Sequence, residues 1–377
     1  MKLGIFTYHF SNNYGALFQA YALRTYLNQA FDVEADFVNY HPDYVEAGGN
    51  FNLKQPLSKD NLKIVFLKMV ELRDKWFGNS AVKQGFESFK KEHLNVVGDK
   101  ILSLDGVLAN VVNMDALICG SDQVWKPSEH YGVDPTYYLA IPNLDEKVKR
   151  IAYAPSFGSA ELDVNHQQQI AAYIKNIDSL SVREQSGCDL VKEITGLTAD
   201  CVPDPTFLLD DFQTVIKEYP LCSSKHVFCY GLRSRDVIGE WAENIASELS
   251  CKLYSPHNPH RRWREIGETV YPCPGQWLYL LKNSEFVVTN SFHGTALSIL
   301  LNKPFIVVRL QGSKTKFNAR VDNLLKKLGL TERAVDAFSD AAVKDMILKE
   351  IDWNSVNKKV EAQRTLGRDF IRKALSL

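Results

Sequence analysis

The chain has 377 residues, of which 45% are hydrophobic and 24% are charged, and this is ordinary for a globular protein of about two domains. Its formal net charge of -1 gives no general attraction to nucleic acid or to anionic membranes, so any anion site has to be local. Its apolar runs are shorter than the ~18–20 residues of a membrane helix, and the first residues lack the apolar region of a secretory signal. We therefore expect a cytoplasmic protein without a transmembrane segment, with peripheral contact to the inner face of the membrane left open.

The seven cysteines are odd in number, and no two of them form a C-x-x-C pair. This pattern favours reduced thiols over a disulfide framework or a zinc site, and we expect no metal.

The first 40 residues predict the opening of a doubly wound domain. Strands at 2–7 and 33–40 flank a helix at 16–28. The turn before the helix lacks the G-x-G-x-x-G pattern of dinucleotide-binding proteins. It is either a plain β–α turn or a source of backbone and amide donors for a substrate. The residues in question are Asn12, Asn13, Tyr14 and Gly15.

Residues 41–94 form a longer helical excursion, with helices expected at 64–77 and 82–94. A basic amphipathic helix can bind a membrane surface or a partner. Acidic residues interrupt the basic face here, which favours packing against the chain's own domain.

Several strands of this first half end in polar residues. The strand at 114–119 runs into a segment that could hydrogen-bond and stack a sugar ring, or could be a turn cap with a core tryptophan. Its candidates are Ser121, Asp122, Gln123 and Trp125. Further along, the strand at 179–182 ends in Arg183. That guanidinium suits a carboxylate or a phosphate, unless Glu184 or another acid holds it in an ion pair.

A proline-rich segment at 201–206 marks the expected junction between domains 1–207 and 208–377. The second half again alternates strands with helices, which predicts a second Rossmann-like domain with a mainly parallel sheet. The final helix, at about 356–375, has no strand after it and could pack back on the first domain.

Residues 285–308 carry the clearest site pattern. A strand at 286–288 runs into the polar turn 289–294, a helix at 295–301 and a strand at 305–308. Ligands of open α/β sheets sit beyond the carboxyl ends of the strands, and a helix N-terminus there suits an anion. His293 lies at this place, so we favour a functional role over a hydrogen bond within the turn. The loop expected at 309–320 adds Lys314 and Arg320, which either bind an anion or are solvated.

Six short motifs in this order resemble the polysaccharide pyruvyl transferase family, from residue 3 to about residue 330. They are Asn-Asn-Tyr-Gly-Ala, Gly-Ser-Asp-Gln-Val-Trp, Tyr-Ala-Pro-Ser-Phe-Gly, Ser-Val-Arg-Glu, Asp-Pro-Thr and Asn-Ser-Phe-His-Gly. The resemblance implies two Rossmann-like domains in a glycosyltransferase-B-like arrangement with an interdomain cleft. It implies transfer of the pyruvyl group of phosphoenolpyruvate to two hydroxyls of one sugar, giving a cyclic ketal and phosphate. It also implies donor contacts from Arg183 and His293, although some members carry an arginine where this chain has Ser291.

On this basis we expect His293 to be the acid or base, Arg183 to clamp the donor, and Asp122 to orient or deprotonate the acceptor hydroxyl. The expected donor site comprises Arg183, Ser291, Phe292, His293, Gly294, Lys314 and Arg320. The expected acceptor site comprises Asn12, Asn13, Tyr14, Gly15, Ser121, Asp122, Gln123 and Trp125. The acceptor is expected to be a sugar or a lipid-linked oligosaccharide, and phosphoenolpyruvate is a co-substrate in a reaction that needs no cofactor.

Two other functions fit the same sequence. One is a nucleotide-sugar-dependent glycosyltransferase of the same two-domain shape, because fold alone does not fix function. The other is a sugar- or anion-binding protein without turnover, which the serine at position 291 keeps open.

Overall fold

The structure, a computed structural model, divides into two compact units. The residues that it describes are 1–46, 61, 64, 65, 68, 69, 79–96, 98–128, 131–220, 222, 225–232, 236–257 and 265–376. Unit 1 comprises Met1–Ser80, Lys90–Leu209 and Leu366–Leu377, and unit 2 comprises Ala81–Phe89 and Asp210–Thr365.

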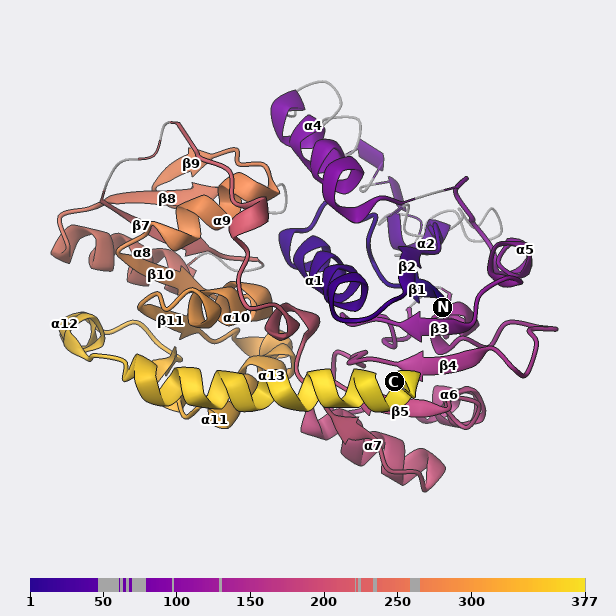
Figure 1. Ribbon diagram of the computed structural model, residues 1–377. Coiled ribbons are helices and arrows are strands. Elements are labelled where there is room, and N and C mark those ends of the chain that lie inside the picture. The colour runs from indigo at the N-terminus through magenta and orange to yellow at the C-terminus, as the bar shows by residue number, and fades with distance from the viewer. Residues whose placement is uncertain are drawn as a thin grey trace. The chain divides into compact units, whose positions relative to one another are not determined.

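Unit 1 is built on a parallel sheet that has six strands among the described residues (Figure 1). Their spatial order is β2 (Glu34–Phe37), β1 (Lys2–Phe6), β3 (Ala116–Cys119), β4 (Lys149–Ala152), β5 (Ser179–Val182) and β6 (Asp200–Cys201). The order runs outward from β1 in both directions, which is the doubly wound arrangement expected from the sequence. Every residue of β3 is buried, as a central strand covered on both faces requires. The carboxyl ends of all these parallel strands lie along one edge of the sheet.

Helices and short turns connect these strands. They are α1 (Tyr14–Ala30), α2 (Asp43–Glu46), the π-helix η1 (Lys90–Leu94), the 3₁₀ turn η2 (Leu104–Gly106), α5 (Leu108–Val111), the 3₁₀ turn η3 (Pro135–Tyr138), α6 (Val164–Ile174), α7 (Gln185–Thr195) and the 3₁₀ turn η4 (Pro205–Leu208). The helix α7 is absent from the elements expected from the sequence. It ends at Gly196, whose φ of 76° gives the left-handed cap that glycine adopts without strain.

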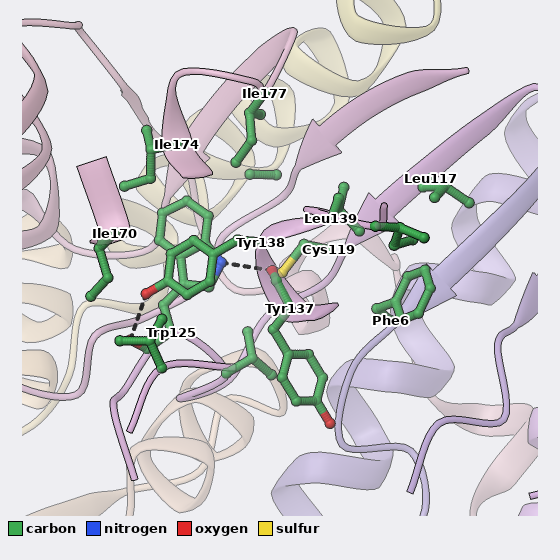
Figure 2. Packing of buried hydrophobic residues seen from close by; sticks show 14 of the residues in the cluster. Phe6, Leu117, Cys119, Trp125, Tyr137, Tyr138, Leu139, Ile170, Ile174 and Ile177 are labelled. Atoms are coloured by element: carbon green, nitrogen blue, oxygen red, sulfur yellow. Dashed lines mark hydrogen bonds between the residues drawn. The ribbon is translucent and has the colours of Figure 1, made fainter. Parts of the chain in front are cut away.

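The core on one side of this sheet is rich in aromatic residues (Figure 2). Trp125 is 1% exposed and stacks on Tyr138, with ring centroids 4.9 Å apart. Its Nε1 donates to the Tyr137 carbonyl at 2.9 Å, and the Tyr138 hydroxyl donates to the Trp125 carbonyl at 2.9 Å. These bonds hold the segment after β3 against η3, because each buried polar atom of the pair has a partner.

Unit 2 is built on a second parallel sheet, again of six strands within the described part of the chain (Figure 1). Their spatial order is β12 (Ala334–Val335), β11 (Phe305–Val308), β10 (Phe286–Thr289), β7 (His226–Tyr230), β8 (Lys252–Pro256) and β9 (Glu268–Val270). The helices of this unit are α4 (Ser80–Phe89), α8 (Asp236–Glu248), α9 (Pro274–Lys282), α10 (Phe292–Leu300), α11 (Asn318–Leu328) and α12 (Asp340–Leu348). The 3₁₀ segments are η5 (Gln213–Val215), η6 (Gly312–Phe317) and η7 (Thr331–Arg333).

The last helix, α13 (Trp353–Leu375), begins in unit 2 and ends in unit 1. Within unit 2, the Lys359 ammonium donates to the Leu328 carbonyl at 3.1 Å. Within unit 1, the Arg368 guanidinium donates two hydrogen bonds to the Leu208 carbonyl, at 2.7 and 3.1 Å. The end of the chain is therefore part of the first unit's packing.

Some expected elements differ from those observed. The helix expected at 82–94 is α4 followed by the π-helix Lys90–Leu94, and most of the helix expected at 64–77 lies outside the described residues. Among the described residues, no helix has the length and apolar character to cross a membrane, and no three His, Cys, Asp or Glu side chains gather as a metal site would require.

Candidate functional site

The carboxyl edge of the unit 1 sheet carries a hydrogen-bonded group that we call the strand-end network. Its members are Thr7, Ser121, Ser156, Arg183, Glu184 and Asp204. Thr7 Oγ1 donates to the Ser121 carbonyl at 3.0 Å, and Ser121 Oγ donates to the Ala154 carbonyl at 2.8 Å. These two bonds link the ends of β1, β3 and β4.

Arg183 is the centre of this network and is only 3% exposed. Its Nη1 donates to Asp204 Oδ2 at 2.9 Å, and its Nε lies 3.6 Å from Glu184 Oε2. Glu184 in turn accepts from Ser156 Oγ at 2.6 Å. Burial lowers the pKa of Arg183, but the carboxylates of Asp204, Glu184 and Asp122 more than offset this, so the pKa lies above its ordinary value.

This geometry favours the ion pair that the sequence left open for Arg183 over a clamp on a donor anion. The guanidinium is buried and faces two carboxylates, so its charge is already balanced inside unit 1. The ion pair that the sequence left open as an alternative is the one observed, with Asp204 as a second partner. Arg183 joins the ends of β5 and β6 and does not form an exposed clamp.

Asp122 lies at the same edge and is half-buried. Its φ of 78° is in the left-handed region, which aspartate tolerates better than most residues. Its Oδ1 accepts from its neighbour's backbone, Gln123 N, at 2.8 Å, and its carbonyl accepts from Ser156 N at 2.9 Å. The loop is therefore fixed by its own backbone, and the carboxylate stands beside the strand-end network.

Trp125 does not have the position expected for sugar stacking. It is buried in the unit 1 core, with Tyr138 on its ring face (Figure 2). The Phe157 ring is tilted against it, with ring centroids 5.3 Å apart. The structure places this ring in the core, because the chain after β3 turns inward to meet η3. The core tryptophan that the sequence offered as the alternative reading is the one observed.

The segment 12–15 is mainly the start of α1. The Asn13 side chain accepts from Ala16 N at 3.1 Å and caps the helix, which begins two residues before the expected position 16. Tyr14 and Gly15 are buried in the first turn. Asn12 is exposed, and its Oδ1 accepts from the Lys90 ammonium at 2.8 Å.

His9 and His41 are titratable residues near this edge that the sequence reasoning missed. His9 is 1% exposed, with Nδ1 3.0 Å from the Thr7 carbonyl and its ring stacked on Phe37 at 5.1 Å. Burial lowers the pKa of His9 to about 4 and that of His41 to about 3. The signal in the sequence was the position of His9, three residues beyond the end of β1.

The carboxyl end of β10 in unit 2 is a second polar strand end. The Thr289 hydroxyl donates to the Tyr230 carbonyl at 2.8 Å and accepts from Ser291 N at 3.1 Å. Ser291 caps α10, because its side chain accepts from Gly294 N at 3.3 Å. These bonds fix the backbone on which His293 is carried.

His293 lies in the first turn of α10, not in a polar turn before it, because α10 begins at Phe292 and the expected start was 295. The side chain is 7% exposed and meets Phe292 edge to face at 5.2 Å. The positive end of the helix dipole is at this turn, which favours negative charge near His293.

Most of the segment 309–320 is helical instead of the expected loop, with η6 from Gly312 followed by α11. Arg309 is held by Asp322 at 2.9 Å and by Asp336 at 3.1 Å. Arg320 is half-buried in the first turn of α11. The backbone of Lys314 lies in η6, and its side chain lies outside the described part of the structure.

In fold the chain is a two-unit α/β protein, and solved structures share this fold. A putative UDP-N-acetylglucosamine 2-epimerase from Listeria monocytogenes is 11% identical, and the match covers 100% of this chain and 95% of that chain with a TM-score of 0.52. The UDP-N-acetylglucosamine 2-epimerase of Rickettsia bellii is 10% identical over the same shares, with a TM-score of 0.50. At this identity the likeness shows the fold alone, and it confirms the two-domain α/β fold with mainly parallel sheets expected from the sequence.

The family model described as polysaccharide pyruvyl transferase matches residues 13–311. The chain belongs to this family, as the resemblance of its motifs predicted. No curated protein matches the chain significantly. The family makes the protein a transferase that acts on polysaccharide.

Proposed function

We propose that this protein transfers the pyruvyl group of phosphoenolpyruvate to two hydroxyls of one sugar during polysaccharide biosynthesis. The product is a cyclic ketal, and phosphate is released. The observation that carries the proposal is the family match over residues 13–311, which contains the polar end of β10 and every member of the strand-end network except Thr7. His293, at the second of them, supplies a residue type that exchanges protons near neutral pH.

The donor carries a carboxylate and a phosphate, so its site has to offer positive charge. The strand-end network opposes one guanidinium with two carboxylates, which argues against donor binding at Arg183. The first turn of α10 offers the positive end of a helix dipole. Arg320, in the first turn of α11 of the same unit, is the guanidinium that we assign to the donor. We assign Lys314 to the same anion from its place in the sequence.

The reaction begins with a proton. His293, as imidazolium, gives a proton to the methylene carbon of the donor, and positive character develops at the adjacent carbon that bears the phosphate oxygen. A sugar hydroxyl adds to that carbon and gives its proton to a carboxylate base, and phosphate then leaves with the electron pair of its bond to that carbon. The second hydroxyl closes the ring and gives its proton to the released phosphate. The base returns its proton to His293 through solvent, so the two hydroxyl protons end on the new methyl group and on phosphate. General acid–base assistance of this kind is typically worth about 10²–10⁴-fold.

The acceptor is assigned to unit 1, at Asp122. A carboxylate can accept a hydrogen bond from a sugar hydroxyl and take its proton as the hydroxyl attacks. Asp122 stands on a loop whose backbone is held on both sides, so its position costs little reorganisation.

The test is a screen of sugar acceptors with labelled phosphoenolpyruvate, with a parallel calorimetric comparison of phosphoenolpyruvate against uridine and guanosine diphosphate sugars. We expect phosphoenolpyruvate to bind and label to appear in a sugar together with phosphate. Tight binding of a nucleotide sugar with no response to phosphoenolpyruvate would identify a glycosyltransferase instead. Binding of phosphoenolpyruvate without product from any sugar would support a binding protein.

A further inference from the structure

A cysteine and a histidine are hydrogen-bonded at the amino edge of the unit 2 sheet. Cys222 Sγ lies 3.4 Å from His226 Nδ1, and His226 Nε2 lies 2.8 Å from the Leu280 carbonyl oxygen. His226 is the first residue of β7, whereas His293 follows the carboxyl end of the parallel neighbour β10. We call Cys222 and His226 the thiol–imidazole pair. The pair is therefore at the opposite edge of the sheet from His293.

The hydrogen bond to Leu280 fixes which nitrogen of His226 carries a proton. A carbonyl oxygen only accepts, so Nε2 is the donor, and Nδ1 of the neutral ring is an acceptor. The lone pair of Nδ1 therefore faces the Cys222 thiol, which donates to it. A nucleophile, a base and a group that orients the base follow one another in this order, which is the arrangement that activates nucleophilic side chains.

The end of α9 makes this imidazole a better proton acceptor. Leu280 is in the last turn of α9, where carbonyl groups have no partner within the helix and the helix dipole is negative. Positive charge on His226 is stabilised there, which offsets part of the cost of charging a ring that is 0% exposed. His226 can thus take the thiol proton while Cys222 attacks another molecule.

Cys222 is accessible to a small reagent. It is half-buried, unlike Cys119 and Cys229, which are 0% exposed. Burial raises the pKa of the Cys222 thiol, so the thiol keeps its proton at rest. The thiolate is the form that reacts, and the reactivity of Cys222 therefore depends on removal of this proton by His226.

We propose that Cys222 is a modification site at which small disulfides form a mixed disulfide with the protein. The Cys222 sulfur attacks one sulfur of the reagent, while the thiol proton moves to His226 Nδ1. The S–S bond of the reagent breaks, and the leaving thiolate takes the proton from His226 and departs as a thiol. One disulfide is consumed and one is formed, so no other oxidant is required. Because the pair is at the opposite edge of the sheet from His293, this modification is separate from pyruvyl transfer.

Cys251 is a matched control in the same unit. It is also half-buried, burial also raises its pKa, and its Sγ also has a hydrogen-bond acceptor at 3.4 Å. That acceptor is the Leu249 carbonyl, which cannot take a proton from a thiol as an imidazole can. The comparison of Cys222 with Cys251 therefore tests the effect of the base beside the thiol.

The test treats the folded protein with bis(2-hydroxyethyl) disulfide, a small uncharged reagent, and follows each cysteine by peptide mass spectrometry. The proteins are wild type and His226→Gln, in which the side-chain amide can still donate to the Leu280 carbonyl but no base is present. We expect Cys222 to react at least about 10-fold faster than Cys251 in wild type. In His226→Gln we expect the rate at Cys222 to fall to about that at Cys251.

Equal rates at Cys222 and Cys251 in wild type would overturn the inference, and this comparison holds whether or not the variant folds. An unchanged rate at Cys222 in a folded His226→Gln protein would overturn it as well. Thermal unfolding and the rate at Cys251 check that the variant is folded, because unfolding would expose Cys251 and raise its rate.

Discussion

At the scale of the residue, Gly294 shows how closely the turn before α10 is packed. A Cβ at this position would overlap Thr289 Oγ1 and lie 3.2 Å from the Tyr230 ring. Thr289 cannot move away cheaply, because its hydroxyl is bonded on both sides. We expect Gly294→Ala to lower the free energy of unfolding by about 1–3 kcal/mol.

The matched control for this substitution is Gly239→Ala in α8. A Cβ there meets its nearest atom, Ile266 Cγ1, at the ordinary distance of 3.6 Å. In a helix interior this change is expected to raise the free energy of unfolding by about 0.5–1 kcal/mol. Urea unfolding of both variants checks the pair, and a Gly294→Ala protein as stable as Gly239→Ala would contradict the packing described for α10.

His9 gives a prediction for the pH dependence of stability. Its pKa is lowered to about 4 by burial, whereas an imidazole in the unfolded chain has a pKa of about 6.5. Between these values the unfolded chain binds a proton that folded His9 does not, so stability falls as pH drops from 6.5 towards 4. The loss of folding free energy that His9 causes reaches about 3 kcal/mol below pH 4, and there is no such loss above pH 6.5.

The measurement compares urea unfolding of wild type and His9→Gln at several pH values between 7 and 4.5. Carboxylates affect both proteins alike, so the difference in slope isolates His9. We expect the variant to lose less stability on acidification. The same slope in both proteins would show that His9 titrates normally in the folded state.

At the scale of the element, the pair Arg183 and Asp204 holds the ends of β5 and β6 together. Removing one partner leaves the other charge buried, which costs about 3–5 kcal/mol. We expect Arg183→Gln and Asp204→Asn each to destabilise strongly, and the double variant to lose clearly less than the sum. Urea unfolding of wild type, the two single variants and the double variant gives the coupling free energy between the two side chains.

The exposed pair of Lys252 and Glu268, 3.6 Å apart, serves as the control. Its side chains are more than half exposed, so its coupling should be small. If instead Arg183→Gln kept wild-type stability, Arg183 would be available to a ligand, and the original expectation of a donor clamp would regain its basis.

The elements differ in how far the sequence could predict them. β11 was predicted residue for residue, because its run Phe-Ile-Val-Val is typical of a short buried parallel strand. The bounds of β5 were also predicted correctly, although two of its four residues are serines. The helix α11 was missed, because its basic surface residues conceal an apolar face formed by Val321, Leu324, Leu325 and Leu328. The starts of α1 and α10 were placed late, because their caps are asparagine and serine in runs that also suit a turn.

At the scale of the whole molecule, the sequence predicted both doubly wound units and the family, because strand and helix periods are local properties and the motifs are contiguous. The sequence could not predict in the same way whether the site residues are buried and which residues they contact. The burial of Arg183 depends on Asp204, and that of Trp125 depends on Tyr138, and both partners lie on other elements. Pairings of this kind are set by tertiary packing, which a single sequence does not display.

The central claim is that His293 moves the proton that starts pyruvyl transfer. The most direct measurement is the rate of phosphate release from phosphoenolpyruvate, with acceptor present, by wild type and by His293→Ala. Thermal unfolding and calorimetric affinity for phosphoenolpyruvate serve as controls that the variant is folded and binds its donor. The account predicts a rate lower by about 10²–10⁴-fold with donor binding retained. A folded variant that releases phosphate at a rate close to that of wild type would contradict it.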